Sequence, residues 1–203
     1  MHKVFRIFVM LMVFCTSTVY GKTLLVLGDS LSAAYGIEQR QGWVALMTNR
    51  LAEQGSTLQV VNASISGETT SGGVSRLPKL LDRHQPAYIV LELAANDGLR
   101  GTPLKVIENN LRQLIEMGQQ AGAKILLVGI QLPPNYGPRY TRNFFAIFEK
   151  LQAEYQTYRV PFLMDKVALE PNLMQSDRLH PNAEAQPILL DNVWPGLSEM
   201  LAD

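Results

Sequence analysis

Ser30 is a residue whose type and place in the sequence could support covalent chemistry. It follows a short apolar run, residues 24–27, which is long enough for one buried strand and ends at Gly28. Open α/β sheets bind ligands beyond the carboxyl ends of their strands, where backbone N–H groups and a helix dipole favour a developing anion. A serine there is well placed to act as a nucleophile. Asp29 and Ser30 are also common helix N-cap residues, so the tripeptide alone leaves a capping role open.

A serine nucleophile needs a base, and the chain offers His180 three residues after Asp177. In a turn, this spacing lets the carboxylate reach the imidazole, fix its tautomer and stabilise the imidazolium that forms when Ser30 loses its proton. Pro181 restrains the backbone of His180 to an extended conformation. The alternative is that Asp177 caps the last helix and His180 lies at the surface. His84 lies at the end of a predicted helix, which favours an interaction with the helix dipole over catalysis.

Acyl transfer also needs hydrogen-bond donors for an oxyanion. The backbone N–H groups of Ser30 and Gly67 and the side-chain amide of Asn96 each follow a predicted strand, so they would converge at one sheet edge. Gly67 has no side chain to obstruct a substrate. A tight turn at Gly67 and an Asn-Asp-Gly turn at Asn96 are the ordinary structural alternatives.

Strand and helix patterns alternate along the chain. This alternation predicts a parallel sheet with helices on both faces, joined by right-handed crossovers. We expect strands at residues 24–27, 57–61, 87–93, 123–130 and 161–164, and helices at 41–54, 69–82, 102–122, 141–158 and after 181.

Three local features of the sequence refine this prediction. Thr102 and Pro103 read as the N-cap and first residue of one helix, and residues 94–98 read as a loop. Glu92 lies within an apolar strand, and a buried carboxylate needs a partner that the sequence does not identify.

Residues 1–21 have the pattern of a signal peptide. A basic start is followed by an apolar stretch and by small or polar residues before a cut at Lys22. An uncleaved anchor is one alternative, although the apolar core is short for a membrane span. Lipoprotein cleavage at Cys15 is another, although a bulky residue precedes this cysteine. We therefore expect a periplasmic or secreted protein whose single domain covers residues 22–203, without stable membrane insertion after cleavage.

The composition of that domain excludes several function classes. Removing residues 1–21 takes away Lys3 and Arg6 and leaves 16 basic and 18 acidic residues, which argues against nucleic acid as a partner. The only cysteine, Cys15, is lost too, so a disulfide framework and a cysteine nucleophile are excluded. Two remaining histidines argue against a structural zinc site. The chain has no Gly-x-Gly-x-x-Gly, no complete phosphate-binding loop and no Gly-x-Ser-x-Gly elbow, and we expect no metal or cofactor.

The candidate residues occur in an order that resembles a known family. Gly28-Asp29-Ser30-Leu31, Gly67, Asn96-Asp97 and Asp177-x-x-His180 resemble the four sequence blocks of the SGNH (GDSL) hydrolases. Within that family, Asn96–Gly101 and the residues around His180 look like the bacterial periplasmic thioesterase I/protease I/lysophospholipase L1 group. The resemblance covers nearly all of residues 22–203. It implies a flavodoxin-like, three-layer α/β/α sandwich with a mostly five-stranded parallel sheet.

The same resemblance implies a role for each candidate residue. Ser30 would be the nucleophile, His180 the base and Asp177 the residue that orients it. Ser30, Gly67 and Asn96 would form the oxyanion hole, with no metal or cofactor. The implied substrates are acyl thioesters, lysophospholipids and simple aryl esters, which are small acyl-ester or lipid molecules, and the implied oligomeric state is a monomer.

One block departs from the family pattern. The third block usually reads Gly-Gly-Asn-Asp in this group, whereas here it reads Ala94-Ala95-Asn96-Asp97. If the backbone takes a positive φ at either alanine, the cost is of order 1 kcal/mol. The methyl groups would also narrow the acyl groove or shift Asn96. Two alternatives to a thioesterase stay open: a short-chain esterase that removes acetyl groups, for example from sugars, and a binding module with a degraded site.

Overall fold

The computed structural model describes residues 22–203, and the predicted signal peptide, residues 1–21, lies outside them. Five parallel strands form one sheet in the order β2-β1-β3-β4-β5, which is the flavodoxin-like order. The strands are β1 (Thr23–Gly28), β2 (Gln59–Asn62), β3 (Tyr88–Glu92), β4 (Lys124–Val128) and β5 (Tyr158–Val160). The predicted α/β fold class is confirmed.

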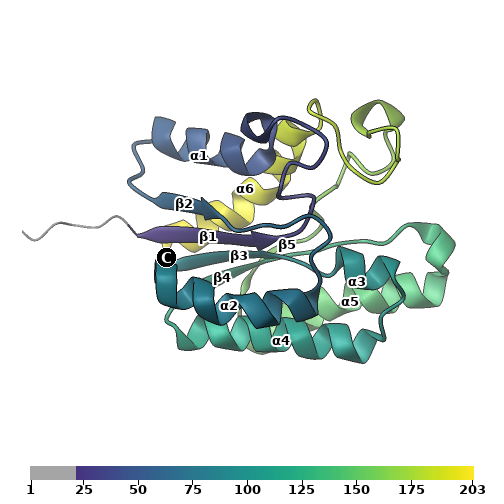
Figure 1. Cartoon of the computed structure of the whole chain (residues 1–203), viewed down its shortest axis with the longest axis horizontal. Coiled ribbons are helices and arrows are strands. Elements are labelled where there is room, and N and C mark those ends of the chain that lie inside the picture. The colour runs from purple at the N-terminus through teal and green to yellow at the C-terminus, as the bar shows by residue number, and fades with distance from the viewer. Residues whose placement is uncertain (1–21) are drawn as a thin grey trace, which may run out of the picture.

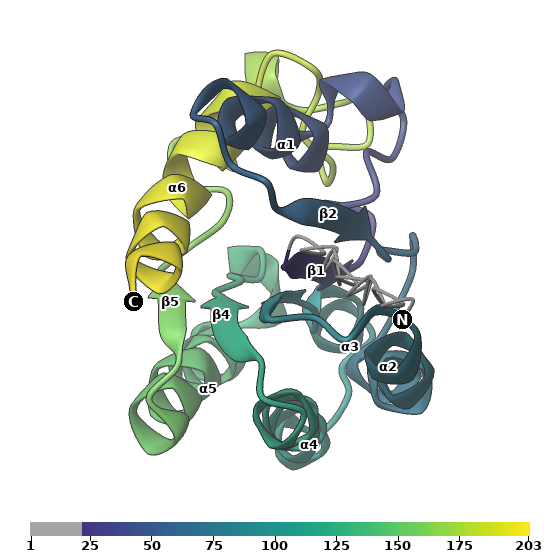
Figure 2. The ribbon, with the colours of Figure 1, turned by 90° about the vertical axis from the view of Figure 1, so that its left-hand side faces the viewer.

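Helices cover both faces of the sheet and make the three-layer sandwich (Figures 1 and 2). One face carries α1 (Trp43–Glu53) and α6 (Gln186–Ala202). The opposite face carries α2 (Thr70–His84), α4 (Leu104–Gln120) and α5 (Pro138–Tyr155). Short helical segments lie between them: α3 (Ala95–Leu99), η1 (Gln39–Gln41), η2 (Pro134–Tyr136) and η3 (Pro171–Leu173).

The sheet divides the core into two apolar layers. Successive side chains of a strand point to opposite faces. In β1, Leu24 and Val26 therefore pack in the layer under α1 and α6, whereas Leu25 and Leu27 pack in the layer over α2, α4 and α5. Burial on both faces explains why the inner strands are almost continuously apolar.

The predicted fifth strand was wrong in position. Strand β5 spans Tyr158–Val160, before the predicted residues 161–164, because Pro161 has no N–H to donate to a strand ladder. The preceding helix is also displaced towards the N-terminus. It ends at Tyr155, where Gln156 takes a left-handed conformation with φ 51°.

Two predicted helix boundaries also need correction. Pro103, not Thr102, holds the N-cap position of α4, and no side chain caps that helix. The carbonyl of Thr102 instead accepts a hydrogen bond from the Tyr140 hydroxyl (2.9 Å). The predicted loop at 94–98 is a short helix, because the Gly98 N–H donates to the Ala94 carbonyl (2.9 Å) and closes a turn.

The segments that carry the candidate residues lie beyond the carboxyl end of the sheet. In Figure 1, the segment after β4 and the yellow-green segment between β5 and α6 lie beyond the same end of the sheet as α3. Among residues 22–203, no helix combines the length and apolar character needed to cross a bilayer.

Candidate active site

Ser30 lies two residues after Gly28, the last residue of β1, in a tight turn. The Ala33 N–H donates to the Asp29 carbonyl (2.9 Å), and the Asp29 side chain accepts the Leu31 N–H at Oδ1 (3.0 Å). These bonds form turns, and the next helical segments begin at residues 39 and 43, so neither Asp29 nor Ser30 is the N-cap of a helix. Asp29 therefore shapes the turn that carries Ser30.

Three side chains from two distant segments form a hydrogen-bonded chain. Ser30 Oγ lies 2.9 Å from His180 Nε2, and His180 Nδ1 lies 2.7 Å from Asp177 Oδ2. With a proton on Nδ1 shared with Asp177, Nε2 is the acceptor for the Ser30 hydroxyl. The structure thus brings together the predicted nucleophile, base and orienting carboxylate.

His180 and Asp177 lie in a hairpin between η3 and α6. Its two arms are joined by the Gln175 N–H to the His180 carbonyl and by the Asn182 N–H to the Leu173 carbonyl, both 2.8 Å. At the tip, Asp177 Oδ1 accepts the His180 N–H (3.0 Å). The capping alternative for Asp177 is wrong, because α6 begins only at Gln186.

The hydrogen bonds at the hairpin tip set the charge of Asp177. Burial would raise the pKa of this carboxyl. The side-chain and backbone hydrogen bonds from His180 and the backbone hydrogen bond from Leu179 outweigh burial and lower the pKa of Asp177 to about 2. Asp177 is therefore a carboxylate at any neutral pH.

Gln175 joins the loops of Ser30 and His180, and sequence reasoning missed it. Its Nε2 donates to the carbonyls of Tyr35 (2.7 Å) and Pro181 (3.0 Å). The Tyr35 ring also lies 4.5 Å from the His180 ring, centroid to centroid. No local pattern marks a lone glutamine in an irregular segment as a link of this kind.

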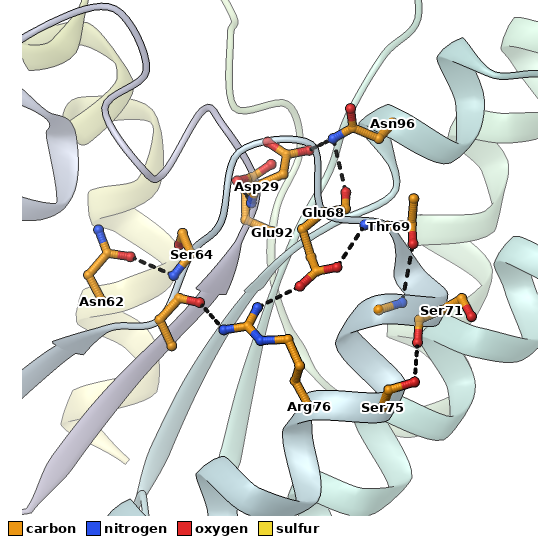
Figure 3. A network of polar contacts seen from close by, with 12 residues as sticks. Asp29, Asn62, Ser64, Glu68, Thr69, Ser71, Ser75, Arg76, Glu92 and Asn96 are labelled. Carbon is orange, nitrogen blue, oxygen red and sulfur yellow. Dashed lines mark hydrogen bonds and ion pairs between the residues drawn. The ribbon is translucent and has the colours of Figure 1, made fainter.

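The three predicted oxyanion donors border one cavity. Gly67 has φ 82°, a left-handed conformation that favours glycine, and Asn96 lies in the first turn of α3. The Asn96 amide Nδ2 donates to Asp29 Oδ2 (3.1 Å) and to the Glu68 carbonyl (2.9 Å), as Figure 3 shows. The amide is thus held by protein partners on both sides, next to Ser30.

A salt bridge holds the loop that carries Gly67. The Glu68 carboxylate accepts a hydrogen bond from Arg76 (2.6 Å), and the same guanidinium donates to the Ala63 carbonyl (2.7 Å) (Figure 3). Arg76 belongs to α2, so the position of the loop depends on the helix behind it. Sequence reasoning did not single out this pair.

Glu92 forms hydrogen bonds with the residues on either side of Ser30. Its Oε2 accepts the Asp29 N–H (3.2 Å) and the Ser32 hydroxyl (2.7 Å), and both carboxyl groups are fully buried. Gly28 pairs with Glu92 across the sheet, and a Cβ on Gly28 would come within 2.7 Å of the Glu92 carboxyl. A glycine ends β1 because the carboxyl occupies that space.

Burial controls the ionisation of this carboxyl pair. It raises the pKa of Asp29 to about 6, against the lowering effects of the Leu31 N–H, His180 and Asn96. Burial raises the pKa of Glu92 well above its usual range, and the negative charge of Asp29 raises it further. At neutral pH the pair therefore carries one charge, on Asp29.

The cavity beside Ser30 has a volume of about 420 Å³ and a mostly apolar wall. Most of the wall comes from the segments after β4 and β5, and includes Ile130, Leu132, Pro133, Phe162, Met164, Leu169 and Met174. Ala95 lines this cavity, whereas Ala94 is buried in the core with φ 108°. The two alanines of the third block therefore have separate effects: a methyl group in the groove at Ala95 and backbone strain at Ala94.

No metal site accompanies these groups in the described residues. Within 22–203, no cluster of three or more His, Cys, Asp or Glu side chains is arranged to hold a metal ion.

A flavodoxin-like sheet with a serine, histidine and aspartate chain at its carboxyl edge has the features of a serine hydrolase. The comparisons with known proteins agree. The model of the GDSL-like lipase/acylhydrolase family matches residues 26–187. Esterase TesA of Pseudomonas aeruginosa is 48% identical over 190 residues, which cover 94% of either chain.

One further relative and one solved structure extend this result. Thioesterase 1/protease 1/lysophospholipase L1 of Escherichia coli is 47% identical over 169 residues, which cover 83% of this chain and 80% of that protein. A crystal structure of TesA superposes with a TM-score of 0.87 at 50% identity, covering 88% of this chain and 99% of the other. The chain belongs to the GDSL-like lipase/acylhydrolase family, and it is a hydrolase of the esterase and thioesterase class.

Proposed function

We propose that Ser30 attacks the acyl carbonyl carbon of an ester or thioester while its proton passes to His180 Nε2. The observation that carries this proposal is the continuous hydrogen-bonded chain from Ser30 through His180 to Asp177, at 2.9 and 2.7 Å, beside an apolar cavity. Asp177 keeps the His180 proton on Nδ1 and stabilises the imidazolium.

The negative charge on the carbonyl oxygen then needs donors. The backbone N–H groups of Ser30 and Gly67 and the amide of Asn96 supply them, and Asn96 does so by sharing the hydrogen that it donates to Asp29. When the tetrahedral intermediate collapses, the C–O or C–S bond breaks. The leaving group takes the proton from His180 Nε2, and the acyl group stays on Ser30.

The second half of the reaction repeats the first with water. His180 Nε2 takes a proton from a water molecule, which attacks the carbonyl carbon of the acyl-enzyme. The Ser30–acyl bond breaks, Ser30 Oγ regains the proton and a carboxylic acid leaves. No cofactor takes part in this sequence.

The substrates that we propose are acyl thioesters, lysophospholipids and simple carboxylic or aryl esters. The apolar wall of the cavity suits an acyl chain rather than a sugar. The relatives named as an esterase and as a thioesterase/lysophospholipase also support this range. We further propose a monomer that is exported and then cut near Lys22, so that the single domain of residues 22–203 acts in the periplasm or outside the cell.

Hydrolysis of p-nitrophenyl esters with acyl chains of increasing length tests this function, with the wild type and Ser30→Ala compared. We expect turnover that favours longer chains and falls at least ~10³-fold in Ser30→Ala, because removing the nucleophile leaves only binding and oxyanion stabilisation. Turnover confined to the shortest esters would instead indicate the short-chain esterase. Equal turnover by Ser30→Ala would refute Ser30 as the nucleophile.

A further inference from the structure

A second hollow adjoins the apolar cavity on the side of the His180 hairpin. It has a volume of about 540 Å³ and shares Ala168, Leu169, Met174 and Arg178 with the cavity. Its own lining adds Pro171, Gln175 and Ser176, so its wall is part apolar and part polar. An apolar cavity and a more polar hollow therefore share a wall, and Arg178 belongs to that wall.

Arg178 carries the charge at this junction. Of the described residues that line the two hollows, Arg178 alone has a permanent charge, and no carboxylate lines either of them. Within residues 22–203, Arg178 forms no ion pair, whereas the neighbouring Asp177 is engaged by His180. The positive charge at the mouth of the site is thus left uncompensated by the protein.

The backbone conformation of Arg178 helps to place this residue where the two hollows meet. Its φ of 55° is left-handed, a conformation that costs free energy for a residue with a side chain, and the Arg178 N–H donates to the Gln175 carbonyl (2.9 Å). The turn holds the arginine at the hairpin tip, one residue from Asp177 and two from His180.

We infer that Arg178 forms a subsite for an anionic, phosphate-bearing leaving group, while the apolar cavity takes the acyl chain. A guanidinium presents several donors in a planar fork that matches phosphate oxygens. The second hollow offers room for the group beyond the scissile bond, and Arg178 lies on the wall between this hollow and the cavity. This inference rests on the proposed function, since it divides the substrate of the same site into an apolar and an anionic part.

The test compares substrates that share an octanoyl chain and differ in the leaving group. Octanoyl-CoA and octanoyl lysophosphatidylglycerol carry phosphate, as a soluble thioester and as a lipid headgroup, and p-nitrophenyl octanoate does not. Arg178→Gln removes the charge at similar size, and Arg178→Lys keeps it. Lys166→Gln is the matched control, because Lys166 is also exposed with φ 59° in the same segment but lines neither hollow.

We expect Arg178→Gln to lower kcat/KM about fivefold to tenfold on a phosphate-bearing substrate, mainly through KM, and less than about twofold on p-nitrophenyl octanoate. Arg178→Lys should retain most of the wild-type ratio of kcat/KM between the phosphate-bearing substrates and p-nitrophenyl octanoate, and Lys166→Gln should retain all of it. Raising the salt concentration from about 0.02 M to about 0.5 M should reduce the difference in kcat/KM between wild type and Arg178→Gln on the phosphate-bearing substrates, because exposed charges are screened. A loss on one of the two phosphate substrates alone identifies which source of phosphate the subsite takes.

Two outcomes would overturn the inference while the proposed function stands. One is an equal change on all three substrates, including no change. The other is a wild type that hydrolyses p-nitrophenyl octanoate but neither phosphate-bearing substrate. A wild type that hydrolyses none of the three contradicts the proposed function itself.

Discussion

At the scale of single residues, Ala94 shows how one methyl group strains the backbone at a positive φ. Its φ of 108° lies in the region that favours glycine, and its side chain is fully buried. The sequence predicted backbone strain at Ala94 if its φ were positive, and this strain is therefore present. The fold tolerates it because the Ala94 carbonyl closes the turn of α3 and the methyl group packs in the core.

Ala94→Gly should stabilise the protein by about 1 kcal/mol, because relief of the left-handed strain outweighs the loss of one methyl group. Ala95→Gly is the matched control. Ala95 has no positive φ and lies in α3, so glycine there should destabilise by about 0.5–1 kcal/mol. Urea unfolding of both variants measures the two signs. The same sign for both would contradict the strain at Ala94.

Asp29 gives the stability of the protein a pH dependence. Its pKa is about 6 in the fold against 3.8 as an ordinary carboxyl, so the folded state holds the proton more tightly than the unfolded state. The contribution of Asp29 is most favourable below pH 4 and is lost as the pH rises through 6. A pKa difference of this size corresponds to about 3 kcal/mol in the free energy of unfolding.

Asp29→Asn removes this titration. The free energy of unfolding of the variant, relative to wild type, should therefore rise by about 3 kcal/mol between pH 4 and pH 7. Urea unfolding at several pH values measures it, and Asp82→Asn is a suitable exposed control. A constant difference between variant and wild type across this range would show that Asp29 does not titrate as the structure indicates.

At the scale of elements, the contact between Ser30 and His180 depends on two irregular segments rather than on a helix or strand. Ser30 is in the turn after β1, and His180 is in a hairpin far along the chain. Gln175 bonds to the backbone of both segments. The 2.9 Å contact between Ser30 and His180 thus relies on a third side chain that takes no part in the proposed proton transfer.

Gln175→Ala should lower kcat about fivefold to thirtyfold with a smaller change in KM, because small displacements of catalytic groups are costly. The fold should lose about 1 kcal/mol or somewhat more, the value of the lost hydrogen bonds. Gln119→Ala is the matched control, since Gln119 also donates to a distant backbone carbonyl, that of Tyr155 (2.9 Å), away from the site. Loss of stability without loss of kcat in Gln175→Ala would show that the link is structural only.

At the scale of the whole molecule, the parallel sheet explains why four separate segments meet. The strands run in one direction, so the turns after β1, β2 and β3 and the segment after β5 reach the same edge. Among the described residues, 22–203, both faces of the sheet carry a buried apolar layer.

The signal-peptide pattern of residues 1–21 predicts that an exported form of the protein lacks them. Intact-mass measurement of the protein recovered from a periplasmic extract should give a chain that begins at or near Lys22, and this form should retain the Ser30-dependent esterase activity. A full-length mass in that fraction would contradict the predicted cleavage. A chain that begins at Cys15 with added lipid would support the lipoprotein alternative.

Much of the fold was predictable, because its signals are local. The apolar runs of β1, β3 and β4 and the apolar stripe of α4 each appear within a single stretch of sequence. The weak element was β5, whose three residues carry little pattern of their own. Its position depends on pairing with Leu126–Val128 in β4, which no local rule reports.

The sequence by itself determined the α/β class, the order of the strands and helices, and the identity of the candidate site residues. The class and the order of elements follow from hydrophobic periodicity. The candidate site residues follow from side-chain types that take part in only a few kinds of chemistry. Only the tertiary structure decided the partners of Glu92, the link made by Gln175 and the strain at Ala94. The physical reason is that the Glu92 and Gln175 contacts join residues 60 and 140 positions apart, while the strain at Ala94 is a backbone angle imposed by its surroundings.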